Sequence, residues 1–457
     1  MVKHDKGSST SGKKSRQPPR QSSSEVEPVD DTPIVYNKPT SSSGGAMYKK
    51  FQVEDLVQEN DKKIVMLVID GLGDIPDPNH DYKTPLEVAK KPNIDKLVKK
   101  SVLGRIIPVH YGVTPGSGAG HLGLFGYDPR NYELGRGIME ALGLDLQIFP
   151  SDVTARGNFV TLDKESLLIK NRRGGPGKDD RLPTAETRQR VEFLSDNVNK
   201  ILSIEILLTP GLDHRFVSIF RGREMRCGLT DSDPGREELP ILQIKALDSN
   251  SQVSAQIVNE FHARANKLLL AEYPYGNSMV MRGFSKRPSW PTMKQRYGLN
   301  CCAIAEYPMY RGLAQILGMD KVSTGSTPED AFKSYLDIYK KYDFFFIHIK
   351  KTDSYGESGK FDEKVGVIES IDAAFPVLES KMPDVLVITG DHSTPVPMKA
   401  HSWHPVPLLI YSEFCGADQS KKFTENECNY GALSTFPSRH LMNIILANAG
   451  KLKKYQA

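Results

Sequence analysis

The chain has 457 residues, of which 39% are hydrophobic and 25% charged, so it holds enough apolar material for two or three domains. Lys and Arg exceed Asp and Glu by only 60 to 56, and this net charge of +4 argues against a nucleic-acid or membrane partner. No apolar run reaches the ~18–20 residues that cross a bilayer, and we expect no membrane span and no secretion signal. Five cysteines without a CxxC motif favour a reducing, cytoplasmic setting over a disulfide framework.

The first 47 residues contain ten serines and five prolines and have almost no apolar periodicity. Such a segment cannot bury enough apolar surface to offset the entropy lost on ordering. We therefore predict a disordered tail over residues 1–47.

Three short, continuous apolar runs predict buried strands, at residues 64–69, 343–349 and 385–389. Runs of this kind are typical of strands covered on both faces, as in a parallel sheet flanked by helices. Helices are predicted from the Thr84-Pro85 start, around 92–98, and over 361–378. Because this alternation lies on both sides of a different middle segment, we predict an α/β domain (48–130 and 300–457) split by an inserted α+β domain (131–299).

Each predicted strand leads into an acidic residue: Asp70, Asp353, and Asp391 followed by His392. The carboxyl ends of parallel strands share one edge of the sheet, where ligands gather. Three carboxylates and an imidazole meeting there would repel one another without cations, and these ligands suit Mn²⁺, Zn²⁺ or Mg²⁺. Any one of the aspartates, taken alone, could instead cap a helix or make a turn.

Two further segments carry reactive side chains. In the PGSGAGHL segment, glycines flank Ser117 where a helix is predicted to start, and free backbone N–H groups there favour an anion. A serine hydroxyl beside a divalent metal can ionise and attack phosphorus, although a Gly-Ser-Gly run alone is usually a flexible turn. Three of the eleven histidines, His392, His401 and His404, fall between residues 391 and 407, which favours ligand or acid–base roles.

Several motifs in order resemble the archaeal-type cofactor-independent phosphoglycerate mutases of the alkaline phosphatase superfamily. They are VIDGLGD at 68–74, TPL at 84–86, the Ser117/His121 segment, FGYDP at 125–129, GRG at 135–137, the stretch 152–159, and DHSTP at 391–395. The resemblance runs from about residue 62 to 448. It implies an alkaline-phosphatase-like α/β domain interrupted by a substrate-binding domain. It also implies two divalent metal ions, with Mn²⁺ favoured and Mg²⁺, Zn²⁺ or Co²⁺ as alternatives.

The resemblance assigns the metal ligands residue by residue. One metal would be held by Asp70, Ser117, Asp391 and His392, and the other by Asp353, Glu357 and His401. The chain departs from the family pattern at three places. Glu357 stands where the TDxxGH pattern has histidine, Arg311 where a lysine is expected near the nucleophile, and His404 where aspartate is common.

The implied reaction interconverts 3-phosphoglycerate and 2-phosphoglycerate, a step of glycolysis and gluconeogenesis, through a phosphoserine at Ser117. Asp152 is a candidate general base, and Arg156, Arg173 and Arg282 are candidate anion forks, although each arginine could simply be solvated. Arg311 would contact phosphate. His121 lies four residues after Ser117, on the same helix face, in either a substrate-binding or a packing role.

Two other functions remain open from the sequence. Water in place of glycerate as the acceptor would make the chain a metal-dependent phosphatase, and another phosphomutase of the same superfamily is also an alternative. The departures at Glu357 and Arg311 also allow a degenerate homologue without catalysis. The sequence predicts a small-molecule substrate and is silent on the oligomeric state.

Overall fold

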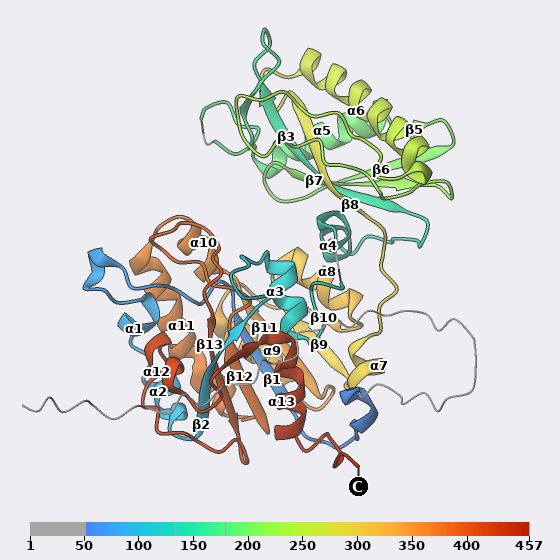
Figure 1. The fold of residues 1–457 in the computed structure, drawn as a ribbon. Helices are drawn as coiled ribbons and strands as arrows, with labels where there is room; N and C mark the ends of the chain where they lie inside the picture. The colour runs from blue at the N-terminus through green and yellow to red at the C-terminus, as the bar shows by residue number, and fades with distance from the viewer. Residues whose placement is uncertain (1–51, 133, 179, 457) are drawn as a thin grey trace, which may run out of the picture. The chain divides into compact units, whose positions relative to one another are not determined.

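The computed structural model describes residues 52–132, 134–178 and 180–456, so the predicted tail at 1–47 lies outside the described residues. Two β-sheets organise the described chain (Figure 1). None of the described helices is long and apolar enough to cross a membrane.

The first sheet has eight strands and contains all three predicted ones. In spatial order they are β10 (Asp320–Val322), β9 (Cys301–Ile304), β11 (Phe344–Ile349), β1 (Ile64–Ile69), β12 (Val385–Thr389), β13 (Val406–Ser412), β2 (Ser101–Ile107) and β14 (Thr435–Pro437). Seven strands share one direction, whereas β13 runs antiparallel to both of its neighbours, so the sheet is mixed and not purely parallel. The connection from β12 to β13 contains no helix to carry the chain across the sheet, and the chain turns back beside β12.

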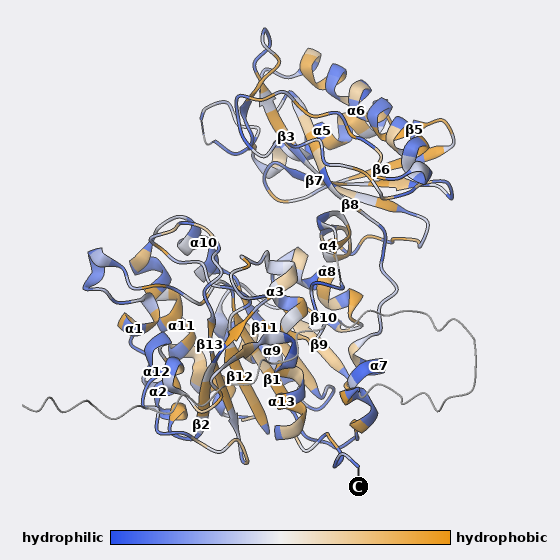
Figure 2. Ribbon diagram, in the orientation of Figure 1, coloured by the Kyte–Doolittle hydropathy of each residue, from blue (hydrophilic) through white to orange (hydrophobic). Residues whose placement is uncertain are grey.

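Both faces of this sheet are buried, which explains the continuous apolar runs. Along β1, Ile64, Met66 and Val68 belong to one core and the alternate residues to the other, as the two-residue period of a strand requires. Figure 2 shows the apolar strands between the helices. One face is covered by α1 (Pro85–Val88), α2 (Pro92–Val98), α9 (Pro328–Ile338), α11 (Phe361–Glu379) and α12 (Glu425–Tyr430). The other face is covered by α3 (Ser117–Leu124), α4 (Arg136–Gly143), α7 (Met293–Tyr297), α8 (Pro308–Ile316) and α13 (Leu441–Asn448).

The second sheet is antiparallel and has its own core. Its strands are β3 (Val153–Leu162), β4 (Ile169–Asn171), β5 (Lys200–Ile201), β6 (Ile204–Pro210), β7 (Arg215–Arg221) and β8 (Ser278–Ser285). Helices α5 (Thr184–Asn197) and α6 (Gln252–Glu272) pack on it. All of these elements lie inside the predicted insertion at 131–299, while Met293 and Tyr297 of α7 pack into the core of the first sheet.

The predicted start of α1 is held by a capping box that also reaches a buried acid. Thr84 Oγ1 accepts a hydrogen bond from Glu87 N (3.1 Å), and the Glu87 carboxylate accepts one from Thr84 N (2.9 Å). The Thr84 hydroxyl in turn donates to Glu425 Oε2 (2.6 Å). The other oxygen of Glu425 is buried without a hydrogen-bond partner in the described part of the chain, as suits a neutral carboxylic acid.

Glu425 should make stability fall as pH rises. Burial raises the pKa of Glu425 to about 7, so the folded chain keeps a proton that the unfolded chain releases above its ordinary pKa of about 4.3. Stability present at about pH 5 is therefore lost towards pH 8, by about 3 kcal/mol. Glu425→Gln removes this titration, and its melting temperature should exceed that of the wild type increasingly from about pH 5 to pH 8. An equal difference between the two proteins at both pH values would contradict the prediction.

Candidate active site

The carboxyl ends of β1, β11 and β12 bring the predicted acidic residues to one edge of the first sheet. Asp70 follows β1 directly, Asp391 lies two residues after β12, and Ser117 begins α3. The close packing of these segments against one another depends on two glycines. A Cβ on Gly71, whose φ is +63°, would lie 2.5 Å from Thr394 Oγ1, and a Cβ on Gly120 would lie 2.2 Å from the backbone oxygen of Asp391.

His392 is the centre of the first group of side chains. Its Nε2 atom lies 3.3 Å from Asp70 Oδ1, 3.2 Å from Asp391 Oδ2 and 3.2 Å from Ser117 Oγ. Its Nδ1 atom lies 3.0 Å from Thr394 Oγ1, whose hydroxyl donates to Asp353 Oδ1 (2.8 Å). This series of hydrogen bonds places the imidazole proton of His392 on Nδ1 and leaves the Nε2 lone pair facing the carboxylates.

This first group fits a divalent cation. Asp70, Asp391 and His392 are fully buried, and neither Asp70 Oδ1 nor Asp391 Oδ2 accepts a hydrogen bond of good geometry from the described residues. Two carboxylate oxygens and an imidazole lone pair that face one another without a shared proton repel. A cation coordinated by all three removes that repulsion, and the donor set suits Mn²⁺, Mg²⁺ or Zn²⁺.

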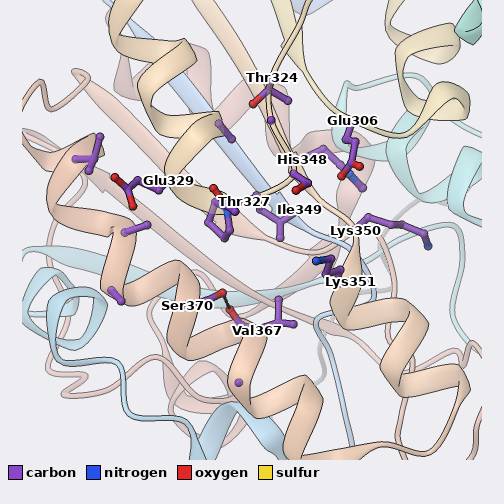
Figure 3. A pocket seen from close by; sticks show the side chains of 18 of the residues that line it. Glu306, Thr324, Thr327, Glu329, His348, Ile349, Lys350, Lys351, Val367 and Ser370 are labelled. Atoms are coloured by element: carbon purple, nitrogen blue, oxygen red, sulfur yellow. Dashed lines mark hydrogen bonds between the residues drawn. The ribbon is translucent and has the colours of Figure 1, made fainter.

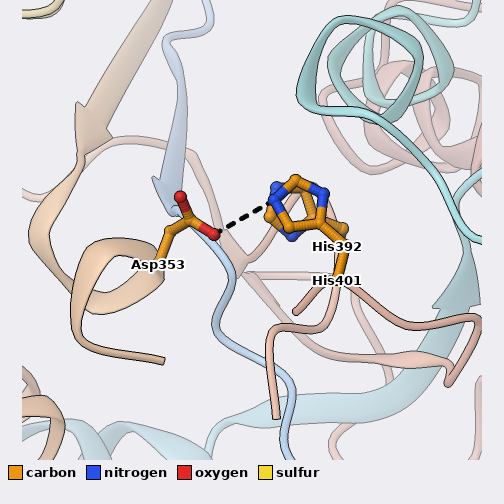
Figure 4. A group of neighbouring side chains, drawn as sticks. All are labelled: Asp353, His392 and His401. Carbon is orange, nitrogen blue, oxygen red and sulfur yellow. Dashed lines mark ion pairs between the residues drawn. The ribbon is translucent and has the colours of Figure 1, made fainter. Parts of the chain in front are cut away.

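A second group joins Asp353, His392 and His401 (Figure 4). His401 Nε2 lies 3.3 Å from Asp353 Oδ1, and its ring stacks on His392 with 3.7 Å between centroids. The Nδ1–H of His401 donates to Pro115 O (2.9 Å), which fixes the ring. Glu357, at the end of α10 (Lys351–Glu357), lies 3.8 Å from His401 Nε2 with its side chain 55% exposed.

Charge pairing holds Asp353 and His401 of this second group in their ionised forms. Burial and the Asp70 carboxylate would raise the pKa of Asp353, but the hydrogen bond with His401 and the charge of Lys350 outweigh them and lower it to about 2. Burial likewise would lower the pKa of His401, but the hydrogen bonds with Asp353 and Pro115 outweigh burial and raise it to about 9. A cation bound by His401 Nε2 would displace the proton there, so affinity should rise with pH.

Several side chains that the sequence analysis did not single out surround Asp70. Tyr310 of α8 donates to Asp70 Oδ2 (2.5 Å), and Thr352 donates to the backbone oxygen of Asp70 (2.5 Å). His348 lies against the Tyr310 ring, with 3.9 Å between centroids, and Lys350 Nζ is 3.0 Å from Asp70 Oδ2. His348, a histidine inside the otherwise apolar run FFFIHI, was the one sequence signal for these side chains around Asp70.

His121 lies behind Ser117 and not on an accessible surface. It is fully buried, and its Nδ1 lies 2.8 Å from Ser117 O and 3.2 Å from Asp391 Oδ2. Burial would lower the pKa of His121, but the charge of Asp391 outweighs it and raises the pKa. These contacts allow His121 to position Ser117 and Asp391, and a direct contact of His121 with substrate stays a prediction.

Three predicted site residues make their contacts elsewhere. Arg311 pairs with Asp145 (3.2 Å), and its neighbour Tyr310 faces Asp70 instead. Asp152 is buried in an ion pair with Arg221 (3.0 Å). Arg173 is exposed. Within the described part of the chain, none of the three has a recorded contact with Ser117 or with the carboxylate and histidine groups.

Arg156 and Arg282 belong to a basic cluster, which we define as Arg136, Arg156, Arg215 and Arg282. Arg156 and Arg282 are register partners on β3 and β8, and Arg215 lies on β7. The Nε atoms of Arg156, Arg215 and Arg282 are buried without a hydrogen-bond partner among the described residues. Burial and, to a smaller extent, the charges of the other three arginines lower the pKa of Arg156 to about 10, despite the carboxylate of Glu140. Unpaired guanidinium donors that repel one another favour an anion with several oxygens.

Comparison with known proteins places this geometry in a class. Residues 62–448 match the model of the metalloenzyme superfamily. The chain is 50% identical over 405 residues to a Thermotoga maritima protein named "Probable 2,3-bisphosphoglycerate-independent phosphoglycerate mutase", covering 89% of this chain and 98% of that protein. A protein of the same name from Aquifex aeolicus is 44% identical over 412 residues, covering 89% and 99%.

Solved structures agree with the sequence relatives. A Pyrococcus horikoshii protein matches with a TM-score of 0.73 at 27% identity, covering 87% of this chain and all of that one. The cofactor-independent phosphoglycerate mutase of Thermoplasma acidophilum matches with a TM-score of 0.61 at 27% identity, covering 85% of this chain and all of that one. The chain is therefore a member of the metalloenzyme superfamily and, within it, belongs to the 2,3-bisphosphoglycerate-independent phosphoglycerate mutases. The predicted fold class and family are confirmed.

Proposed function

We propose that this chain interconverts 3-phosphoglycerate and 2-phosphoglycerate through a phosphoserine at Ser117. One observation carries the proposal: Ser117 Oγ, at the start of α3, lies 3.2 Å from His392 Nε2, which faces the carboxylates of Asp70 and Asp391. The hydroxyl is thereby set between candidate metal ligands and the positive end of a helix, where a phosphoryl group is stabilised.

Two divalent cations fit the residues present. One would be held by Asp70, Asp391, His392 and Ser117, and the other by Asp353, His401 and Glu357. The mixture of carboxylate oxygens with imidazole, and the extra negative charge of Glu357, favour Mn²⁺. When bound, the cations promote ionisation of the serine hydroxyl and offset the charge of the phosphoryl oxygens.

The reaction balances without water. The Ser117 hydroxyl gives up its proton as its oxygen bonds to phosphorus, the bond from phosphorus to the 3-oxygen of glycerate breaks, and that oxygen takes up a proton. Glycerate then turns within the site, its 2-oxygen loses a proton and bonds to phosphorus, and the serine oxygen takes up a proton as its bond to phosphorus breaks. Each half forms and breaks one phosphorus–oxygen bond, so the net change is a shift of the phosphoryl group.

Retention of glycerate between the two halves requires a second anchor, and the basic cluster supplies one. The Nε donors of Arg156, Arg215 and Arg282, which are buried and have no hydrogen-bond partner among the described residues, suit the glycerate carboxylate. Arg156 and Arg282 keep the substrate role predicted for them, and Arg136 and Arg215 join them. The ion pairs of Asp152 with Arg221 and of Arg311 with Asp145 favour structural roles for those two residues. All five cysteines are free, as is usual for a protein working in the cytoplasm.

Product analysis of the full-length, Mn²⁺-loaded protein tests the proposal. With 3-phosphoglycerate, we expect 2-phosphoglycerate, followed by coupling to enolase, and little inorganic phosphate. Chelation should abolish the conversion, and added Mn²⁺ should restore it, because the serine and the phosphoryl group both lose their charge partner. Phosphate release without 2-phosphoglycerate would identify a phosphatase instead. A protein that binds Mn²⁺ but forms neither product would be a non-catalytic homologue.

A further inference from the structure

A lysine ammonium lies between the two groups of candidate metal ligands. Lys350 Nζ is 3.0 Å from Asp70 Oδ2, in the first group, and also pairs with Asp353 Oδ2, in the second. Both carboxylates are buried, at 0% and 4% side-chain exposure, and the Lys350 side chain is 24% exposed. Lys350 is therefore the one fully ionised cation that bridges the two groups within the described part of the chain.

The position of Lys350 conflicts with a divalent cation on the same carboxylates. Lys350 pairs with the Oδ2 atoms of Asp70 and Asp353, whereas their Oδ1 atoms face His392 and His401. A metal ion on those Oδ1 atoms would share both carboxylates with the ammonium group, and two positive charges held a few ångströms apart repel strongly at low dielectric. Either the cation binds against this repulsion, or the lysine side chain moves away. Lysine has a flexible four-carbon stem with a compact charge, so the second outcome needs no backbone change.

The structure contains a place for the displaced side chain. Lys350 lines a cavity of about 770 Å³ between α9 and α11, together with Lys351 and three acidic residues, Glu306, Glu329 and Glu363 (Figure 3). An ammonium group that leaves Asp70 and Asp353 can thus enter a solvated space whose walls also carry carboxylates.

We propose that Lys350 is an internal counter-ion that competes with divalent cations for Asp70 and Asp353 and moves into this cavity when they bind. The inference rests on the metal-dependent part of the proposed function and adds a determinant of metal affinity. It predicts two effects of opposite sign for one substitution. Loss of the ammonium should destabilise the protein without metal, because buried carboxylates lose their partner, and should strengthen metal binding.

Lys350→Met tests both effects, since methionine keeps an unbranched stem and removes the charge. In the full-length, chelator-treated protein we expect the melting temperature to fall by several degrees. We expect the Kd for Mn²⁺ alone, measured by titration calorimetry, to fall at least about tenfold. Lys351→Met is the matched control, because Lys351 is the next residue, lines the same cavity and is exposed. It should leave both values unchanged.

An unchanged or raised Kd for Lys350→Met would overturn the proposal. Should that variant fail to fold without metal, Lys350→Gln purified with Mn²⁺ and titrated with a competing chelator measures the same Kd, with the same expected fall. Lys350→Arg retains the charge and should bind Mn²⁺ as the wild type does. Because no substrate is present, a wild type that binds Mn²⁺ but lacks mutase activity defeats the proposed function and leaves this test intact.

Discussion

Ser117→Ala should lower mutase turnover by at least about 10⁴-fold, the scale seen when a covalent nucleophile is removed. The hydroxyl that lies 3.2 Å from His392 Nε2 is lost, and no phosphoryl-enzyme can form. Metal binding should survive in large part, because Asp70, Asp391 and His392 remain. Coupled assays report the turnover, and mass spectrometry of acid-quenched enzyme reports a phosphoryl group on Ser117 in the wild type alone.

A second serine variant serves as the control that separates loss of the nucleophile from a general loss of folded protein. Ser354 lies directly after Asp353, on the exposed side of α10, and Ser354→Ala should keep wild-type turnover. Measured Mn²⁺ content of the Ser117 variant shows whether the cations are still held. Turnover above a tenth of the wild-type value, with metal bound, would remove Ser117 from the nucleophile role.

Asp391→Asn should weaken Mn²⁺ binding by at least about 100-fold and reduce turnover accordingly, since even residues that only support metal ligands account for factors of 10–100. The substitution preserves size and leaves an oxygen for the backbone N–H of Gly71, which Asp391 Oδ1 accepts at 3.1 Å. What it removes is the negative charge opposite His392 and beside His121. Titration calorimetry with Mn²⁺ measures the affinity independently of turnover.

Asp372→Asn is the control for burying an amide in place of a carboxylate. Asp372 is also buried and also accepts a backbone N–H, from Ile94 (2.8 Å), but it lies on α11. This variant should lose some thermal stability and keep wild-type affinity for Mn²⁺. Equal loss of affinity in both variants would show that the Asp391 effect is one of folding and not of coordination.

Much of the fold follows from local pattern. The three apolar runs predicted β1, β11 and β12, because a strand buried on both faces has no polar positions. The Thr84-Pro85 pair predicted where α1 begins, and the spacing over 361–378 predicted α11 to within one residue. The reversal of β13 had no such signal. Its run is as apolar as that of its neighbours, and strand direction depends on what the connection does in space.

The candidate site likewise contains residues that the sequence predicted and residues that it did not. Asp70, Asp353, Asp391 and His392 were predictable because strand ends of shared direction meet at one edge. Tyr310 and Arg311 are adjacent on α8, and a helix turns successive side chains onto different faces. Which of them reached Asp70 depended on how α8 packs. Only Arg156 and Arg282 of the basic cluster were predicted from the sequence. The arginines of the cluster come from α4, β3, β7 and β8, and in the sequence they cannot be told from solvated surface residues.

The sequence by itself determined the sheet at the core, the aspartates and histidine at its edge, and the serine at the start of α3. These depend on hydrophobic period and on residues a few positions from a strand or helix end. Only the tertiary structure decided that Tyr310 supports Asp70, that Lys350 bridges Asp70 and Asp353, and that Arg156, Arg215 and Arg282 gather with buried Nε atoms that have no hydrogen-bond partner among the described residues. These depend on contacts between residues distant in the chain, whose energies arise from burial and charge at positions that no local pattern specifies.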